Sequence, residues 1–390
     1  MAVEHDIVVF EGDYAGPEHY LSVDNGLKKV LREIERQTKG TNFNLKYRLI
    51  GGSSWDADGV TISQETLTEA ASASAVLLGA VGGPKWSMAG VAVESGLGRL
   101  RKAMDAFGNL RPISFIAPSL VAQSALKPER CCGTSMTIVR ELTGGMYFGE
   151  KTEHDGSFNM AADTDLYTRA EIERAARLAG KLATATDPPL PVISLDKANA
   201  LASCGRLWRG VVSQIMAAEF PQVRLQHMLI DTAAMVMASN PTRLNGIVLT
   251  SNMFGDIISD EASAIVGSIG LLPSASLCDI PEDVEGETEF VVFMSLFTTS
   301  FQSCCRLSLM NRRAGSAPDI AGKGIVNPAG MILSVGMMFK YSLKMPLAAA
   351  CIERAVNMTL ESGLRTPDIG GSASTSEFGD AVVATLATLL

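Results

Sequence analysis

Two carboxylates four residues apart, Asp256 and Asp260, have a type and spacing that suggest metal chemistry. At helical spacing, residues i and i+4 lie on one face, so both side chains point the same way. Like charges so close repel unless a cation lies between them, and carboxylate oxygens suit Mg²⁺ or Mn²⁺ better than Zn²⁺. The alternative is a solvated acidic helix face. The pair follows the apolar run 247–250, which predicts a buried strand, and open α/β sheets bind ligands where strands end. A divalent-metal site is therefore favoured.

Two arginines could serve an acidic substrate. Arg101 and Arg111 lie ten residues apart in the stretch 94–112, which predicts an amphipathic helix closed by Gly108 and Asn109, with one arginine at each end. Guanidinium groups stay charged at any working pH and bind carboxylates through paired hydrogen bonds, which suits a di- or tricarboxylate. The alternative, usual for an arginine on a helix, is a surface charge.

A lysine at the end of a predicted strand is a candidate base. Lys197 follows the apolar run 192–195 and lies between Asp196 and Asn199. Burial can lower a lysine pKa and make the amine an acceptor of protons. Taken alone, Lys197 is more typical of a surface lysine than of a catalytic base.

Several apolar runs must position these groups. The runs 7–10, 75–80, 192–195 and 247–250 lack charge and predict buried strands, while helical patterns lie between them. This alternation predicts an α/β fold with a largely parallel sheet. The run 75–80 ends in Gly-Gly-Pro and lacks the G-x-G-x-x-G spacing, so we do not predict a Rossmann fold.

Composition excludes several classes of protein. The chain has 390 residues, 47% hydrophobic content and a net charge of −9, which fits a globular protein and argues against nonspecific nucleic-acid binding. No apolar run is long enough to span a membrane. Seven cysteines without C-x-x-C spacing argue against structural zinc and favour a reducing compartment. With no leader-like N-terminal segment, we expect a cytoplasmic protein.

Longer motifs carry a family resemblance. The runs SNMFGDIISDEAS (251–263) and GSIGLLPSASL (267–277) resemble the metal-binding signature of the β-decarboxylating dehydrogenases, the 3-isopropylmalate, isocitrate and tartrate dehydrogenase family. The detail is most similar to the fungal 3-isopropylmalate dehydrogenases. The GDxxGPE turn at 12–18, DKAN at 196–199 and GSAPDIAGKGIVNP at 315–328 extend the resemblance over nearly the whole chain.

The resemblance implies roles for individual residues. The catalytic acid and base would be Tyr147 and Lys197. The metal ligands would be Asp231, Asp256 and Asp260. The substrate-binding residues would be Arg101, Arg111, Arg140, Glu94, Leu97 and the residue at Gly98. The cofactor-binding residues would be Gly315, Ser316, Ala317, Pro318, Asp319 and Asn327. An aspartate at 319 accepts hydrogen bonds from ribose hydroxyls and repels a 2′-phosphate, which favours NAD over NADP.

The resemblance also implies architecture and activity. It predicts the two-domain isopropylmalate-dehydrogenase fold, with residues 1–107 and 267–390 forming a discontinuous cofactor domain and 108–266 a middle domain whose segment 151–168 forms a dimer arm. A homodimer with shared active sites is expected, in which Lys197 and Asp231 act in the partner's site. The implied reaction is NAD-dependent oxidative decarboxylation of a 3-substituted malate, with Mg²⁺ or Mn²⁺. For 3-isopropylmalate the product is 4-methyl-2-oxopentanoate, in leucine biosynthesis.

Two departures from the family pattern leave alternatives open. Gly98 stands where isopropylmalate dehydrogenases have a second pocket leucine, which predicts either neutral repacking or a pocket for a bulkier substituent such as benzyl, in a secondary-metabolite pathway. The segment 291–314 has no acidic residue and carries Asn311 and Ala314 where the family has Glu and His. It is either a true insertion or a gene-model artefact, such as a retained intron that replaces an exon edge. A catalytically dead dimer that has lost NAD binding is the corresponding alternative function.

Overall fold

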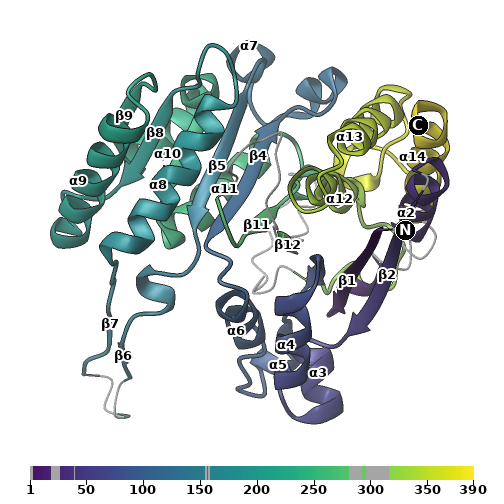
Figure 1. Ribbon diagram of the computed structural model, residues 1–390, viewed down its shortest axis with the longest axis horizontal. Coiled ribbons are helices and arrows are strands. Elements are labelled where there is room, and N and C mark those ends of the chain that lie inside the picture. The colour runs from purple at the N-terminus through teal and green to yellow at the C-terminus, as the bar shows by residue number, and fades with distance from the viewer. Residues whose placement is uncertain are drawn as a thin grey trace.

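A ten-stranded sheet forms the centre of the molecule in the computed structural model (Figure 1). The structure describes residues 3–18, 27–38, 40–153, 156, 159–280, 292–295 and 316–390. In spatial order the strands are β2 (Thr41–Arg48), β1 (Val3–Gly12), β3 (Ala75–Ala80), β12 (Val292–Ser295), β11 (Ala275–Leu277), β4 (Gly108–Ser114), β5 (Ser135–Glu141), β10 (Gly246–Thr250), β8 (Val192–Asp196) and β9 (Leu225–Leu229). Pairing is parallel except at β12–β11, β11–β4 and β4–β5. The α/β prediction is confirmed.

The predicted strands form because they are buried on both faces. Every described residue of β3 and of β10 is buried, as the charge-free runs 75–80 and 247–250 predict. The runs 7–10 and 192–195 lie within β1 and β8. These four strand predictions are confirmed.

Helices cover the sheet. The longer ones are α2 (Leu27–Gln37), α8 (Arg169–Thr184), α9 (Ala202–Glu219), α10 (Ile230–Ser239), α11 (Asn252–Ile265), α12 (Ala329–Tyr341), α13 (Pro346–Glu361) and α14 (Thr375–Leu389). The shorter ones are α3 (Gly51–Asp58), α4 (Gln64–Ser72), α5 (Pro84–Ser87), α6 (Ser95–Ala103) and α7 (Pro128–Cys131). In Figure 1, α8 to α11 lie around β5, β8 and β9, and α12 to α14 lie beside α2.

Strands from the two predicted domains form separate blocks of this sheet. The block from β2 to β11 comes from residues 1–107 and 267–390, and the block from β4 to β9 comes from 108–266. The blocks meet where β11 pairs with β4. The division into two domains stays a prediction.

The predicted helix over 94–112 is too long. Helix α6 ends at Ala103, Asp105 adopts a left-handed conformation (φ 49°), and the chain enters β4 at Gly108. Residues 108–114 are drawn into the sheet because β5 and β11 offer hydrogen-bonding edges on both sides. The placement of Arg111 at a helix end is therefore wrong: it lies on β4, whereas Arg101 lies near the end of α6.

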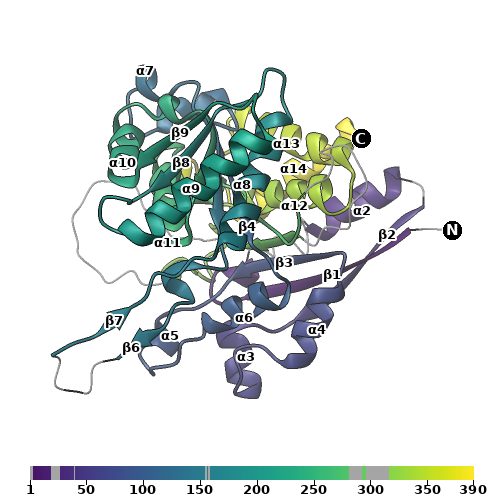
Figure 2. The same cartoon turned by 60° about the vertical axis from the view of Figure 1, so that its left-hand side comes forward.

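The segment 151–168 projects from the molecule, as expected for an exposed excursion. Its two short strands, β6 (Lys151–Thr152) and β7 (Ala162–Asp163), pair antiparallel and are exposed. Figure 2 shows them extending away from the remaining elements. Within 291–314 only 292–295 belong to the described residues, where their backbone forms β12 between β3 and β11. Asn311 and Ala314 lie outside the described residues.

Candidate active site

The antiparallel pairing of β4 with β5 brings two of the predicted arginines to one end of the sheet. Asn109 lies opposite Arg140 in this register, so Arg111 follows two positions along the neighbouring strand. Strand β10 is parallel to β5 and ends beside Arg140, and α11 begins at once after it with Asn252. The first turns of α11 therefore lie over the arginines.

Arg140 is buried and anchored on α11. Its Nε and Nη2 donate hydrogen bonds to Oδ1 of Asn252 at 3.1 and 2.8 Å, and its Nη1 forms an ion pair with Oδ1 of Asp256. The guanidinium also lies 5.6 Å from the ring centroid of Tyr147, a cation–π arrangement. The side chain is thus held from three directions.

Three guanidinium groups converge on this point. Arg111 is buried, and its Nη1 lies 3.8 Å from Oδ1 of Asp260. Burial and then the charge of Arg140 lower the pKa of Arg111 to about 10. Burial followed by the charges of Arg140 and Arg111 lowers the pKa of Arg101 to about 9. Cations that destabilise one another in this way form a strong site for an anion, because a bound carboxylate relieves both the repulsion and the desolvation.

Nε of Arg101 supports this interpretation. It is buried and has no hydrogen-bond partner within the described ranges. Since buried polar groups are nearly always paired, an orphaned guanidinium N–H beside two further arginines indicates a place for a hydrogen-bond acceptor.

Tyr147 joins the arginine cluster through Asp256. It ends a one-turn 3₁₀ helix, Gly145–Tyr147, and its hydroxyl donates to Oδ2 of Asp256 at 3.0 Å. Burial and the nearby Asp256 carboxylate raise the pKa of Tyr147. The phenol therefore stays protonated around neutral pH and can donate a proton.

Asp256 and Asp260 lie on the same face of α11, as their spacing predicts. Burial and the neighbouring Asp256 charge raise the pKa of Asp260, while Arg111 opposes this shift. The Asp260 side chain is 47% exposed, so its oxygens remain accessible. Two hard carboxylates whose repulsion destabilises the charged state suit a divalent cation. These two donors therefore fit Mg²⁺ or Mn²⁺.

The predicted third ligand lies elsewhere. Asp231, at the start of α10, forms an ion pair with Lys197, with Oδ1 and Nζ 2.7 Å apart. The hydrogen bond from Lys197 lowers the pKa of Asp231. Across the part of the chain that the structure describes, no three His, Cys, Asp or Glu side chains are grouped to hold a metal. One chain thus carries two separate groups: the arginines with Tyr147 and the α11 aspartates, and the Lys197–Asp231 pair.

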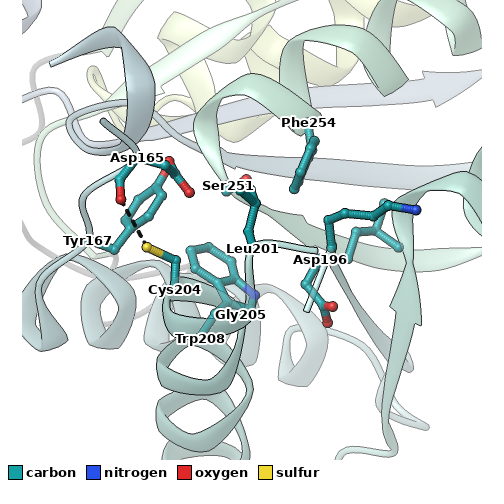
Figure 3. Close-up of a pocket in the computed structure, with 11 residues that line it drawn as sticks. Asp165, Tyr167, Asp196, Leu201, Cys204, Gly205, Trp208, Ser251 and Phe254 are labelled. Carbon is teal, nitrogen blue, oxygen red and sulfur yellow. Dashed lines mark hydrogen bonds between the residues drawn. The ribbon is translucent and has the colours of Figure 1, made fainter. Parts of the chain in front are cut away.

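A small pocket opens beside Lys197 and reaches the first turn of α11 (Figure 3). Tyr167, Trp208 and Phe254 line it. The Cys204 thiol donates to the backbone carbonyl of Asp165, with Sγ 3.0 Å from the oxygen. Burial followed by the Asp165 charge raises the pKa of this thiol, so it remains neutral and is a poor nucleophile.

The predicted cofactor loop is anchored by the turn at 12–18. Glu18 accepts a backbone hydrogen bond from Gly324 at 2.9 Å and another from Gly322. Ala15 N donates to the carbonyl of Ser316 at 3.0 Å. The buried Ser316 hydroxyl has no hydrogen-bond partner among the described residues, as expected where a polar ligand binds.

Other predicted cofactor residues differ in exposure. Asp319 is exposed, Pro318 is half-buried and Ala317 is buried with a left-handed backbone (φ 45°). Asn327 is buried: its Nδ2 donates to Asp368 at 3.0 Å and its Oδ1 accepts from Ala329 N at 3.0 Å. Gly315 lies outside the described residues. The NAD assignment stays a prediction.

The predicted pocket residues lie on or just before α6. Glu94 is exposed, and Leu97 and Gly98 are half-buried. Gly98 is three residues before Arg101, so both positions lie on one helical face. A Cβ added at Gly98 would meet no atom within 4 Å. Position 98 therefore faces open space on the same side of α6 as Arg101.

Comparison with known proteins assigns the family. The model of the isocitrate/isopropylmalate dehydrogenase family matches residues 6–382. The chain belongs to this family. A 3-isopropylmalate dehydrogenase of Alternaria alternata is 63% identical over 386 residues, covering 99% of this chain and 98% of the relative. A 3-isopropylmalate dehydrogenase of Zymoseptoria tritici is 53% identical over 386 residues, covering 99% of each chain. The crystal structure of isocitrate dehydrogenase from Methylococcus capsulatus has a TM-score of 0.79 and 27% identity, covering 98% of this chain and 99% of that one.

Membership of the isocitrate/isopropylmalate dehydrogenase family confirms the predicted fold class and an oxidoreductase enzyme. No helix within the described residues is long and apolar enough to cross a membrane. The sequence interpretation missed two residues that the geometry places beside this dehydrogenase's arginines, Asn109 and Asn252. Asn109 lies two positions before Arg111, and Asn252 lies four positions before Asp256. Their hydrogen-bond partners depend on strand register, which no local pattern reveals.

Proposed function

We propose that this protein catalyses the NAD-dependent oxidative decarboxylation of 3-isopropylmalate to 4-methyl-2-oxopentanoate, as in leucine biosynthesis. The observation that carries the proposal is the convergence of Arg101, Arg111 and Arg140 beside Tyr147 and the α11 aspartates. A malate has two carboxylates, and planar guanidinium groups bind them with defined orientation. The names of the fungal relatives support isopropylmalate as the substrate.

The protein's own residues account for binding and proton transfer. The arginines hold the substrate carboxylates and exclude water from them. Lys197 of a second copy takes the proton of the C2 hydroxyl as that carbon is oxidised. After loss of CO₂ from C3, Tyr147 donates a proton to that carbon. Its raised pKa keeps the phenol protonated before this step.

Metal and cofactor would be held by different sets of residues. Asp256 and Asp260 would hold Mg²⁺ or Mn²⁺ together with Asp231 of a second copy, and Ser316, Asp319 and the loop anchored by Glu18 would hold NAD. When bound, the metal supplies Lewis-acid stabilisation of developing oxygen charge and NAD supplies a hydride acceptor.

A homodimer with shared active sites is part of the proposal, because Asp231 is not grouped with Asp256 and Asp260 among the described residues of one chain. Two large apolar side chains on adjacent helices support it: Met235 on α10 is 67% exposed and Ile257 on α11 is 57% exposed. Large apolar side chains exposed on neighbouring helices are compatible with an interaction surface there. The exposed Met160 and Leu166 in the projecting segment 151–168 support a dimer arm. A second copy seated there brings its Lys197 and Asp231 to the arginine cluster.

A cytoplasmic location is also proposed. All five cysteines within the described residues are free thiols. Free thiols are typical of a reducing compartment.

A second substrate class is favoured by the open space beside Gly98. Because a Cβ there meets nothing within 4 Å, the open space on the Arg101 side of α6 admits a larger C3 substituent, such as benzyl, in a secondary-metabolite pathway. Apolar pockets discriminate by about 1–3 kcal/mol per methylene, so one missing leucine side chain is enough to change substrate preference.

An assay of NADH formation across a panel of 3-substituted malates, with and without Mg²⁺, tests the proposal. Metal-dependent NADH and CO₂ formation from isopropylmalate or benzylmalate is expected. No turnover with any malate, together with no NADH binding by fluorescence at about millimolar cofactor, a weak affinity on the usual scale, would favour a catalytically dead dimer instead.

A further inference from the structure

Two buried asparagines contact the substrate arginines and have no role in the chemistry described above. We propose that Asn109 and Asn252 are positioning residues that hold Arg111 and Arg140 by neutral hydrogen bonds, so that the guanidinium charges stay available to a dicarboxylate ligand. This inference rests on the proposed function, since it deepens the account of the same site.

Asn252 links three parts of the site. Its Oδ1 accepts from Nε and Nη2 of Arg140 at 3.1 and 2.8 Å, and its Nδ2 donates to the carbonyl of Gly144 at 3.1 Å. Its backbone N–H donates to the hydroxyl of Tyr167 at 2.9 Å. One residue thus fixes the arginine, the start of the turn that carries Tyr147, and the first residue of α11.

Asn109 repeats the arrangement on the neighbouring strand. Its Oδ1 accepts from Nε of Arg111 at 3.1 Å. Its Nδ2 donates toward β11, where the Ser274 hydroxyl lies at 2.9 Å and the Ala275 carbonyl at 3.1 Å. In both pairs the asparagine oxygen accepts from the arginine Nε. The Nη1 atom of Arg140 lies beside Asp256, and that of Arg111 lies beside Asp260.

The amide orientations follow from their partners. A guanidinium can only donate and a carbonyl can only accept, so Oδ1 must face the arginine and Nδ2 must face the carbonyl in both cases. The observed contacts are mutually consistent only with the oxygen toward the positive charge.

A neutral acceptor has a specific advantage here. A carboxylate in the same place would make a stronger, two-pronged bond to the arginine, and would also cancel its charge inside a buried site. An amide oxygen aligns the guanidinium without adding a second negative charge to the one that Asp256 or Asp260 already places beside Nη1. Arg101 differs from Arg111 and Arg140, because its buried Nε has no hydrogen-bond partner within the described residues. This N–H is therefore available to a ligand.

Substitutions of the two asparagines can separate the effect of side-chain charge from the effect of side-chain shape. Asn252→Asp is isosteric, and an acidic residue suits the first turn of α11 because of the helix dipole. Asn252→Ser keeps a neutral acceptor but shortens the side chain. Asn109→Asp is an independent arm of the same test. The matched control is Asn245→Asp, which makes the same change near the start of β5, where Asn245 accepts from Ser135 N at 2.8 Å.

The experiment measures malonate binding to the full-length protein by isothermal titration calorimetry, with thermal midpoints recorded for every variant. Malonate probes the arginine cluster without requiring turnover. Asn252→Asp and Asn109→Asp are expected to weaken malonate binding at least tenfold and to lower the thermal midpoint, because a carboxylate cannot donate to the Gly144 or Ala275 carbonyl. Asn252→Ser is expected to weaken binding less than Asn252→Asp. Asn245→Asp should bind as wild type does.

The opposite order would overturn the inference. If the asparagines only support packing, the isosteric aspartates bind malonate as wild type does and the serine variant is the more damaged. If Asn252→Asp does not fold, the decision rests on Asn109→Asp by the same criterion. Absence of malonate binding by wild-type protein is a different failure, because it removes the dicarboxylate site and the proposed function with it.

Discussion

Lys197 and Asp231 form an ion pair within one chain, with Nζ and Oδ1 2.7 Å apart. Neither residue joins the cluster of Arg140, Tyr147 and Asp256, and no three potential metal ligands gather among the described residues. An exposed pair of this kind contributes little to stability, so its value lies elsewhere. In the proposed dimer, Lys197 and Asp231 of each copy lie at the arginine cluster of the other copy.

Activity with any malate is expected to require a divalent cation and to fall by roughly 10²-fold or more in Asp260→Asn, because the substitution weakens the site and the electrostatic stabilisation together. NADH formation titrated with Mn²⁺ measures this. Glu261→Gln is the matched control, since it removes a charge from the next position on α11, which points to another face. Full wild-type activity in excess chelator would refute the metal assignment.

Metal affinity is expected to decline as the pH falls, starting above the range of an ordinary aspartate. Burial raises the pKa of Asp260, and a protonated carboxyl cannot act as a ligand. Affinity is therefore full above this raised pKa and is lost as the pH drops through it. Mn²⁺ binding followed by electron paramagnetic resonance from about pH 8 down to about pH 4, near the ordinary aspartate value, checks the sign. A flat affinity over that range would contradict the prediction.

Tyr147→Phe should leave malonate binding nearly unchanged and slow product formation by about 10²–10⁴-fold, the usual contribution of a general acid. The separation of binding from turnover follows because the hydroxyl contacts Asp256, whereas in the proposed site the arginines bind the ligand. Steady-state kinetics with calorimetry measures both quantities. Tyr47→Phe, on β2, is the control; equal kcat for wild type and Tyr147→Phe would exclude the acid role.

Gly98→Leu should raise the ratio of activity on isopropylmalate to activity on benzylmalate by about tenfold, within the 1–3 kcal/mol that apolar pockets contribute. The added side chain fills the open space on the Arg101 face of α6. Gly98→Ala should leave the ratio near wild type while stabilising the helix by about 1 kcal/mol. If wild type already prefers isopropylmalate and Gly98→Leu leaves the ratio unchanged, the enlarged pocket is wrong and leucine synthesis stands.

Sequence patterns predicted the parts of this site that are local. The charge-free run 247–250 predicted β10, and the spacing of Asp256 and Asp260 predicted that both lie on one face of α11. The end of α6 was not predictable in this way. It depends on the left-handed Asp105 and on strand edges supplied by residues distant in the chain.

The roles of Asn109 and Asn252 also depend on the register of the strand pairing, which the sequence alone does not give. Asn109 meets the site only because β4 pairs antiparallel with β5 and places it opposite Arg140. Asn252 meets Arg140 only because β10 lies parallel to β5 and ends beside it. Pairings between residues so far apart in the sequence leave no periodic signal. Type and spacing suggested Arg101 and Arg111, the family resemblance added Arg140, and neither revealed the asparagines that hold Arg111 and Arg140.

Mixing two inactive variants tests the shared active site most directly. Lys197→Ala and Arg140→Ala each damage a different group, and a hybrid dimer contains one site in which both the lysine and the arginine are intact. After subunit exchange, verified by native mass spectrometry, the mixture should regain NADH formation at a substantial fraction of wild type, while each variant alone stays inactive. Verified hybrid dimers with no recovered activity would show that Lys197 acts within its own chain, and the account of a site completed by a second copy would be wrong.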